Sequence, residues 1–294
     1  MNKSSKIGSF CLAAILLGAM NANAALVDIL AELGDAGKYA VFSMSGTFQN
    51  DSLVTINGDA AVGPNGSANI AAPSTINGTL YKDPTATVSG PGKITGGIVT
   101  TNLQQAVNDA ISASNAFANM PATRMFSSLS TATTINGNGG NNVISLSGSI
   151  NLGGSDNLTL NGTANDRFIF NILGGLTLTG SSSVVLTGGV TANDVAFNFI
   201  GGGSSISTHV GNTISGILLA PQRDMTLDGT FFGKLIGGGS TLTLMSGAIV
   251  NGVTVVPEVT PGSVILGFLG LVVAVASRRA IARQPQRARA RKRF

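Results

Sequence analysis

A four-residue pattern recurs along most of the chain and sets the strongest limit on its fold. The copies have a Thr or aliphatic residue, an aliphatic residue, a small polar residue and then Gly, except that one variant begins with Lys93. The clearest copies occupy residues 55–58, 75–78 and 134–137, and variants occupy 93–96, 159–162, 177–180, 185–188, 213–216, 226–229 and 249–252. Each copy predicts a short strand that points its aliphatic side chain inward and its Thr outward, and that a glycine turn closes.

Some of the glycines that follow these strands recur every 18–20 residues, as in Gly58 to Gly78 and Gly162 to Gly180. Such a period suits one coil of a β-solenoid, in which each coil completes its core by stacking on the next. Other spacings are uneven, so we expect an irregular solenoid. A β-sandwich is the alternative, because similar strand and turn spacing would fit one.

Residues 101–120 depart from the strand pattern and predict one long helix. Thr101 to Gln104 read as a capping box, apolar residues follow at helical spacing, and Pro121 would end the helix. Its single apolar face suggests that it packs along the solenoid. The nearly apolar strands 168–170 and 217–219 should be covered on both sides, and this helix could cover them. The predicted fold class is therefore all-β with one helix alongside.

The composition leaves few groups for chemistry. Hydrophobic residues make up 43% of the chain, which is enough to bury a core, but charged residues make up only 10%. One His, one Cys and no Trp weaken zinc, haem, thiol and His-dependent hydrolase chemistry, and we expect no cofactor or metal.

The net charge of +4 comes from the two ends of the chain. Residues 25–277 hold 7 basic and 13 acidic residues, which gives −6. This acidic body argues against nucleic acid as a partner.

The N-terminus has the organisation of a secretory signal peptide, which we place at residues 1–24. Lys3 and Lys6 precede the apolar stretch 10–19, and Ala22-Asn23-Ala24 matches a small-x-small cleavage site. Cys11 lies inside this segment, so the exported chain would contain no cysteine and no disulfide. A buried first helix is the alternative.

Residues 255–294 predict a second targeting segment. The apolar run 259–276 is just long enough to span a bilayer as a transmembrane helix, and an Arg-rich tail that would stay cytoplasmic follows it. Pro257 and Glu258 precede the run. This order resembles the PEP-CTERM sorting signal of Gram-negative bacteria, although Val259 stands where a second Pro is usual. The resemblance implies processing by an exosortase-like enzyme and a link to exopolysaccharide at the cell surface. A plain stop-transfer anchor is the alternative.

The body, residues 25–254, resembles the ice-binding-protein-like solenoid family of microbes. The resemblance begins at residues 33–41 and includes the glycine-rich opening 56–64, the position of the helix, the central strands 167–172 and 182–189, and the last coils 193–199, 216–220 and 233–236. Ala61, where Gly is usual, and residues 221–224 depart from the pattern. Membership implies a right-handed β-solenoid (β-helix) with a helix alongside, and it does not by itself guarantee ice binding.

Ice adsorption needs a flat, rigid face of small side chains that carry both hydroxyl and methyl groups. Threonine suits this role because its χ1 is restricted, so little entropy is lost when it becomes ordered. The candidate ice-binding residues are the outward threonines of the predicted strands: Thr55, Thr75, Thr134, Thr159, Thr177, Thr226 and Thr243. Outward Thr is also an ordinary strand residue, so the uneven spacing leaves the functional face unassigned.

An enzyme acting on polysaccharide would need clustered carboxylates with a basic partner. The best cluster in the sequence is Arg223, Asp224 and Asp228, with Asp194 one coil away. Acids on turns are more often turn-forming or solubilising, so we predict no enzyme. The sequence instead predicts an exported protein, secreted or at the cell surface of a Gram-negative bacterium, that adsorbs to ice and inhibits recrystallisation. The alternative function is a matrix or adhesion protein that contacts extracellular polysaccharide.

Overall fold

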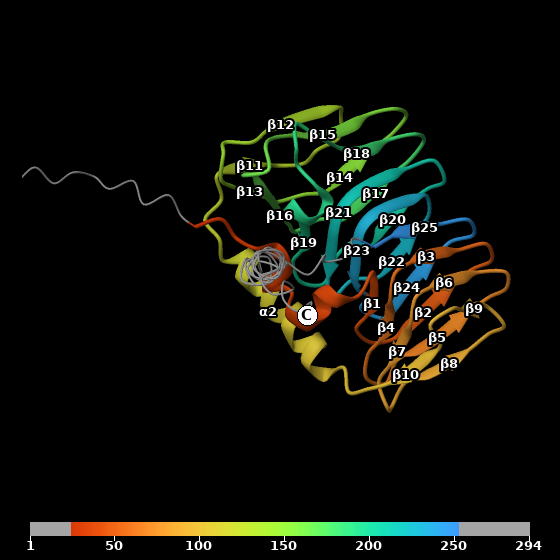
Figure 1. Ribbon diagram of the computed structural model, residues 1–294. Helices are drawn as coiled ribbons and strands as arrows, with labels where there is room; N and C mark the ends of the chain where they lie inside the picture. Colours follow the sequence, from red (N-terminus) through yellow and green to blue (C-terminus); the bar gives the residue numbers. More distant parts are fainter. Residues whose placement is uncertain (1–24, 253–294) are drawn as a thin grey trace, which may run out of the picture. The chain divides into compact units, whose positions relative to one another are not determined.

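Three rows of parallel strands form the body of the protein, and most coils contribute one strand to each row (Figure 1). The computed structural model describes residues 25–252. Every strand pair is parallel, and each inner strand bonds to the coils on both sides of it. This confirms the stack of parallel strands with one long helix and excludes a β-sandwich, whose strands are antiparallel. The right-handed winding stays a prediction.

The first row is an eight-stranded sheet of short strands. In spatial order it contains β14 (Ile150–Leu152), β17 (Leu176–Leu178), β20 (Ile206–Thr208), β22 (Met225–Leu227), β24 (Thr241–Leu244), β2 (Thr47–Asn50), β5 (Ser67–Ile70) and β8 (Thr87–Ser89).

The other two rows belong to one 17-stranded sheet, because β21 (Thr213–Ala220) and β23 (Thr230–Gly237) run through both. One row holds β12 (Thr133–Asn136), β15 (Asn157–Asn161), β18 (Ser183–Thr187), the first halves of β21 and β23, β25 (Ile249–Asn251), β3 (Thr55–Asn57), β6 (Thr75–Asn77) and β9 (Lys93–Ile94). The other holds β11 (Arg124–Phe126), β13 (Asn141–Leu146), β16 (Arg167–Ile172), β19 (Val195–Phe199), the second halves of β21 and β23, β1 (Val41–Ser43), β4 (Ala60–Val62), β7 (Leu80–Lys82) and β10 (Ile98–Thr100).

Glycine makes the corner between these two rows possible. Gly216 and Gly233 lie in register in the middle of β21 and β23, with φ values of +143° and +137°. A Cβ on Gly233 would lie 2.0 Å from the Gly216 carbonyl oxygen. Only glycine therefore lets the two strands turn the corner while they stay paired.

The chain does not climb the stack in one direction. Residues 41–100 wind from the middle of the stack to one end, where β10 is the last strand of its row. After α2 (Gln104–Ala118), β11 begins at the opposite end of the row, and residues 124–252 wind back to the middle. The last coil then pairs with the first in all three rows, through β23 on β1, β24 on β2 and β25 on β3.

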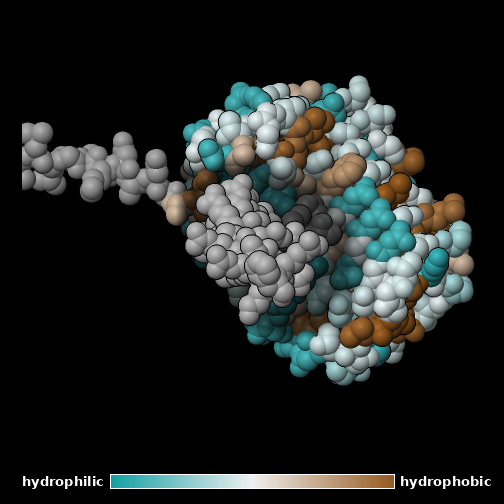
Figure 2. Space-filling view, in the orientation of Figure 1, coloured by the Kyte–Doolittle hydropathy of each residue, from teal (hydrophilic) through white to brown (hydrophobic). Residues whose placement is uncertain are grey.

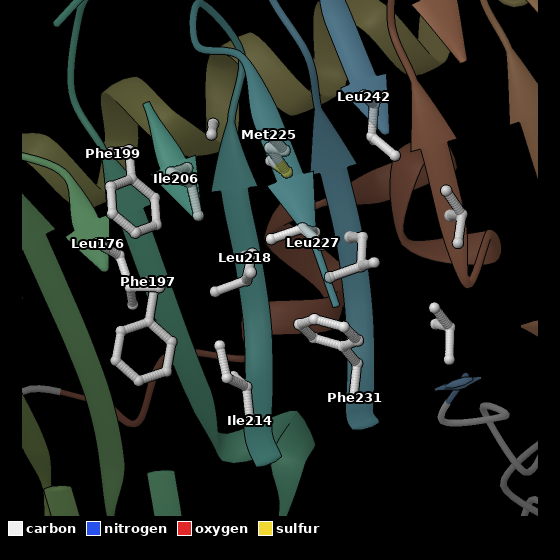
Figure 3. Close-up of a cluster of buried hydrophobic side chains, with 14 of the residues drawn as sticks. Leu176, Phe197, Phe199, Ile206, Ile214, Leu218, Met225, Leu227, Phe231 and Leu242 are labelled. Carbon is white, nitrogen blue, oxygen red and sulfur yellow. The ribbon is translucent and has the colours of Figure 1, made fainter. Parts of the chain in front are cut away.

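The interior of the coils is a continuous apolar core (Figure 3). Aliphatic side chains from the repeated strands, such as Ile56, Ile76 and Leu160, are fully buried there, as the sequence pattern predicts. Aromatic residues fill part of this core, where the Phe170 and Phe197 rings stack with their centroids 4.8 Å apart.

A second apolar cluster joins α2 to the outer side of the row that contains β16, β19 and β21. Ile169 and Ile217 point into this cluster, whereas their neighbours Phe170 and Leu218 point into the coils. These strands are thus covered on both sides, as expected. The helix presents Ala106, Ala110 and Ala113, whose small side chains allow close approach, and Phe117 fills the remaining space.

Hydrogen bonds fix the position of α2 on these strands. The Ser114 hydroxyl donates to Asn198 Oδ1 over 2.6 Å, and Asn198 Nδ2 donates to the Ser114 carbonyl over 2.9 Å. Asn171 Nδ2 donates to the Phe117 carbonyl over 2.6 Å. These groups are buried, so separating the helix from the sheet would leave them without partners.

The start of α2 corrects the predicted capping box. The helix begins at Gln104, and its N-cap Leu103 makes no side-chain cap. Asp83 Oδ2 instead accepts the Leu103 N–H over 3.1 Å, and Asn102 Oδ1 accepts the Gln104 N–H. A contact from the preceding coil therefore replaces the local cap, which the local sequence could not show. Not every apolar side chain of the helix is buried, because Ile111 is 42% exposed.

Three short helical segments complete the described residues. α1 (Ile29–Glu32) and η1 (Gly34–Lys38) lie beside α2, where the Asp35 N–H donates to Asp109 Oδ2 over 2.9 Å. η2 (Ala192–Asp194) leads into β19. None of the helices within residues 25–252 is long and apolar enough to cross a membrane.

One core position breaks the apolar pattern. Asn50 is fully buried in register with Leu244 and Ile70, and neither its Nδ2 nor its Oδ1 has a hydrogen-bond partner. A buried amide without partners loses its hydration and gains nothing in return.

We predict that Asn50→Leu raises the free energy of unfolding by about 1–3 kcal/mol, because it removes this penalty and fills an inward column of Leu and Ile. Urea denaturation followed by circular dichroism would measure the change. Asn142→Leu is the matched control, because buried Asn142 donates to Gly140, Asp166 and Arg167 and should lose stability when changed. Equal destabilisation by both changes would contradict the prediction.

Candidate functional site

The outer side of the eight-stranded sheet is a polar surface, which we call the open face. Its central column contains one outward residue from each strand, in spatial order Asn151, Thr177, Ser207, Thr226, Thr243, Gln49, Asn69 and Ser89. A second column at one end contains Thr241, Thr47, Ser67 and Thr87. No outward side chain in these eight strands is charged or large and apolar.

Backbone geometry makes the open face regular. Parallel strands lie about 4.8 Å apart, so eight strands span roughly 34 Å. Along a strand the outward residues are two apart, which is roughly 6.6 Å. The column positions are therefore set by the ladder, and side-chain contacts add order. Asn69 Nδ2 donates to Gln49 Oε1 over 3.1 Å, and the Ser67 hydroxyl donates to the Thr47 hydroxyl over 3.3 Å.

The outer side of the row from β12 to β9 is chemically mixed, and we call it the mixed face. It carries three partly exposed apolar side chains, Val185, Phe232 and Ile249, and the exposed Lys93. Apolar residues also form separate patches among polar ones over the surface visible in Figure 2. The ordered part of the mixed face is an amide ladder. Asn77 donates to Asn57 over 2.9 Å, and Asn57 donates to Asn251 over 2.8 Å.

The structure divides the seven predicted threonines between these two faces. Thr177, Thr226 and Thr243 lie in the central column of the open face. The other four lie on the mixed face, Thr55 and Thr75 in one column and Thr134 and Thr159 in another. Ile249 follows Thr55 in its column, and Val185 follows Thr159 in the other.

The sequence pattern did not identify most of the open-face residues, because it marks strands that end in a glycine turn. Such strands are concentrated on the mixed face. A second signal was available in the first three coils, where Thr47, Ser67 and Thr87 are spaced by 20 residues, as are Gln49, Asn69 and Ser89. No local signal could have aligned these residues with Thr243, because the pairing of β2 with β24 joins distant parts of the chain.

The charged residues considered as a possible enzyme site, Arg223, Asp224, Asp228 and Asp194, are engaged in structural hydrogen bonds and ion pairs. Arg223 is buried, and its guanidinium donates to five backbone carbonyls, those of Leu173, Gly174, Ile200, Gly201 and Ser204. All five of its N–H donors can thus be used in joining turns of successive coils.

The neighbouring acids are also engaged. Asp224 accepts the Ser240 and Thr241 N–H groups, and Asp228 accepts the Gly229 N–H. Asp194 pairs with Arg167 over 2.9 Å and caps the turn at Thr191. Each of these four residues is therefore engaged in contacts that hold turns of the fold. Residues 25–252 also contain no group of three His, Cys, Asp or Glu side chains that could hold a metal ion.

The predicted signal peptide 1–24 and sorting segment 255–294, with Pro257 and Glu258, lie outside the described residues. The helix expected at 259–276 lies there too.

Comparison with known proteins identifies relatives of this fold. The chain is similar to the crystal structure of an ice-binding protein from the Antarctic ascomycete Antarctomyces psychrotrophicus, with a TM-score of 0.56 and 24% identity, over 74% of this chain and 96% of that one. It is similar to an ice-binding protein from an Arctic yeast with a TM-score of 0.57 and 22% identity, over 80% of this chain and 99% of that one. It is also similar to a domain of ice-binding protein 1 from Shewanella frigidimarina, with a TM-score of 0.56 and 16% identity, over 76% of this chain and 97% of that one.

No curated protein matches the chain in sequence. The family described as Ice-binding-like matches residues 41–250, which is most of the chain and nearly all of the stacked coils. The chain therefore belongs to the Ice-binding-like family.

Proposed function

We propose that this protein adsorbs to ice through the open face and thereby inhibits the growth and recrystallisation of ice. The observation that carries the proposal is the central column of the open face, which runs through eight strands without a charged or bulky apolar side chain. Membership of the Ice-binding-like family supports it, as does the similarity of the fold to those of ice-binding proteins from an Antarctic ascomycete and an Arctic yeast.

The regular spacing of outward side chains on the open face favours adsorption to ice. Strand backbones in a continuous ladder hold the outward side chains on a fixed two-dimensional grid, and Thr and Ser have few rotamers to lose on binding. Water over such a grid can be ordered at little entropic cost to the protein. A charged side chain would instead keep its own hydration shell. The absence of charge from the eight strands therefore favours contact with ice.

The mixed face suits this role less well. Phe232 and Ile249 are 43% and 38% exposed and interrupt its threonine columns, and Lys93 ends one column. The third row is covered by α2 along its central strands. Only the open face is continuous, uncharged and uncovered within the described residues.

We predict that Thr226→Tyr with Thr243→Tyr lowers the potency of recrystallisation inhibition and thermal hysteresis by about tenfold or more, equivalent to ~1.4 kcal/mol or more of adsorption free energy. The two residues are adjacent in register, so two bulky rings would lift the face from ice. Tyr is a favourable strand residue, so the fold should persist. Both activities would be measured on the full chain.

Thr75→Tyr with Thr159→Tyr is the matched control, because both residues are outward threonines of strands on the mixed face. This pair should keep its activity within about twofold, roughly 0.4 kcal/mol. If the control pair lost as much activity as the open-face pair, the assignment of the face would be wrong.

The route of the protein to ice rests on the sequence of its ends. We propose that residues 1–24 direct export and that residues 255–294 are a sorting segment which an exosortase-like enzyme processes in a Gram-negative host. Ice outside the cell would then be accessible to the open face, whether the protein is released or held at the cell surface.

We predict that the exported protein begins at Ala25, because Ala22-Asn23-Ala24 fits a signal-peptidase site. N-terminal sequencing of the protein recovered from outside the cells or from their surface would test this. Ala24→Arg should block the cleavage and leave the longer chain. Recovery of the unchanged chain with residues 1–24 attached would contradict the prediction.

A further inference from the structure

A cavity of about 350 Å³ lies at the start of α2, away from the open face. It is lined by residues of η1, the ends of neighbouring coils and the N-terminal turn of α2. The residues that matter here are Asp35, Lys38, Tyr39, Asp59, Tyr81 and Asn102. The whole sequence contains two tyrosines, and both line this cavity. Its volume is within the range of about 300–1,000 Å³ usual for small-molecule sites.

The aromatic wall of the cavity is held in place by packing. The Tyr39 and Tyr81 ring centroids are 5.5 Å apart at 56°, and Phe42 packs on Tyr39 at the same distance. Tyr39 is only 7% exposed, and Tyr81 is half-buried. The rings therefore offer a preformed apolar surface whose ordering costs a ligand little.

The polar groups of the cavity include both donors and acceptors that are free to bind. The Tyr39 hydroxyl has no hydrogen-bond partner among residues 25–252, although its side chain is more than nine-tenths buried. Burial, together with the charges of Asp35 and Asp59 and the nearby Tyr81, raises the pKa of Tyr39 to about 12. This hydroxyl is therefore a neutral donor at pH 7.

Asp59 supplies the complementary acceptor. Its Oδ1 accepts the Thr79 N–H over 2.7 Å, which fixes the carboxylate, while Oδ2 has no partner in the described part of the chain. The lining also includes Asp35, which pairs with Lys38 over 2.6 Å. The charged lining residues thus sum to about −1, from two carboxylates and one ammonium.

We propose that this cavity binds a neutral sugar residue. A sugar ring has an apolar C–H face that can pack on a tyrosine, and hydroxyl groups that can donate to Asp59 and accept from Tyr39. A phosphate or carboxylate ligand would be repelled by the two aspartates, and an organic cation would meet Lys38 and the donor hydroxyl. Because the cavity is separate from the open face, a glycan and ice could be bound at the same time.

Tyrosine fluorescence offers a direct test, because the chain has no Trp and both tyrosines line the cavity. The full chain would be titrated with D-glucose, D-galactose, D-mannose and N-acetyl-D-glucosamine, with saturation-transfer NMR as a second readout. We expect at least one of these sugars to bind with a Kd of about 1 mM and to change the fluorescence. Sodium phosphate and tetramethylammonium chloride should produce no change.

Two conservative variants locate the binding. Tyr39→Phe removes only the hydroxyl, and Asp59→Asn keeps an oxygen for the Thr79 N–H; each should weaken sugar binding about tenfold, which NMR measures independently of fluorescence. Asp228→Asn, on a turn remote in sequence, is the matched control and should bind as the unchanged protein does. Both cavity variants should keep full recrystallisation inhibition, so this test is independent of the ice-binding proposal.

Two results would overturn the inference. One is the absence of any sugar response up to tens of millimolar in both readouts. The other is unchanged sugar affinity in Tyr39→Phe and Asp59→Asn when thermal melts show both variants to be folded.

Discussion

The pairing of the last coil with the first is the interaction on which the rest of the structure depends. It joins β23 to β1, β24 to β2 and β25 to β3, across about 194 residues of sequence. Without it the chain would form two shorter stacks, each with three additional unpaired strand edges. With it the stack is continuous, and the open face extends from β14 to β8. The proposed ice-binding surface is therefore a product of long-range pairing, with five strands from the second half of the chain and three from the first.

The three rows differ in what covers them, and this difference assigns their roles. Helix α2 lies on one row, where Ala106, Ala110 and Ala113 pack and Asn198 anchors Ser114. The mixed face keeps apolar and charged side chains that suit general solvent exposure. The open face has only small or amide side chains, which leaves its regularity intact. The same backbone ladder thus supports one covered, one mixed and one uniform surface.

The sequence predicted the individual strands of the fold better than the order in which the coils stack. Alternation of Thr with Ile or Leu identified inward residues such as Ile56 and Leu160, because the side-chain period of a strand is a local property. The helix was also predictable from its apolar spacing. The pairing of the last coil with the first was not predictable, because the register of Thr47 with Thr241 leaves no signal in either local segment. The helix start was misplaced for the same reason, since Asp83 of an earlier coil accepts the Leu103 N–H.

The candidate site was predictable only in part. Three of seven threonines fall in one column of the open face, and the glycine-turn pattern that selected most of the seven favours strands of the mixed face. The amides Asn69 and Gln49 complete that column but have no threonine signature. The cavity with both tyrosines could not be foreseen either, because Tyr39 and Tyr81 are 42 residues apart and meet through the stacking of coils.

Site-specific labelling tests whether the open face is the surface that contacts ice. In a Cys11→Ser background the chain has no other cysteine, so Thr226→Cys and Thr75→Cys each provide one attachment point on the open and the mixed face. Each variant would be coupled to a bulky maleimide, and its incorporation into a slowly growing ice crystal would be compared with that of the unlabelled variant. We predict that the label at position 226 excludes the protein from ice and that the label at position 75 does not. Incorporation of both labelled proteins, or exclusion of the one labelled at position 75 alone, would contradict it.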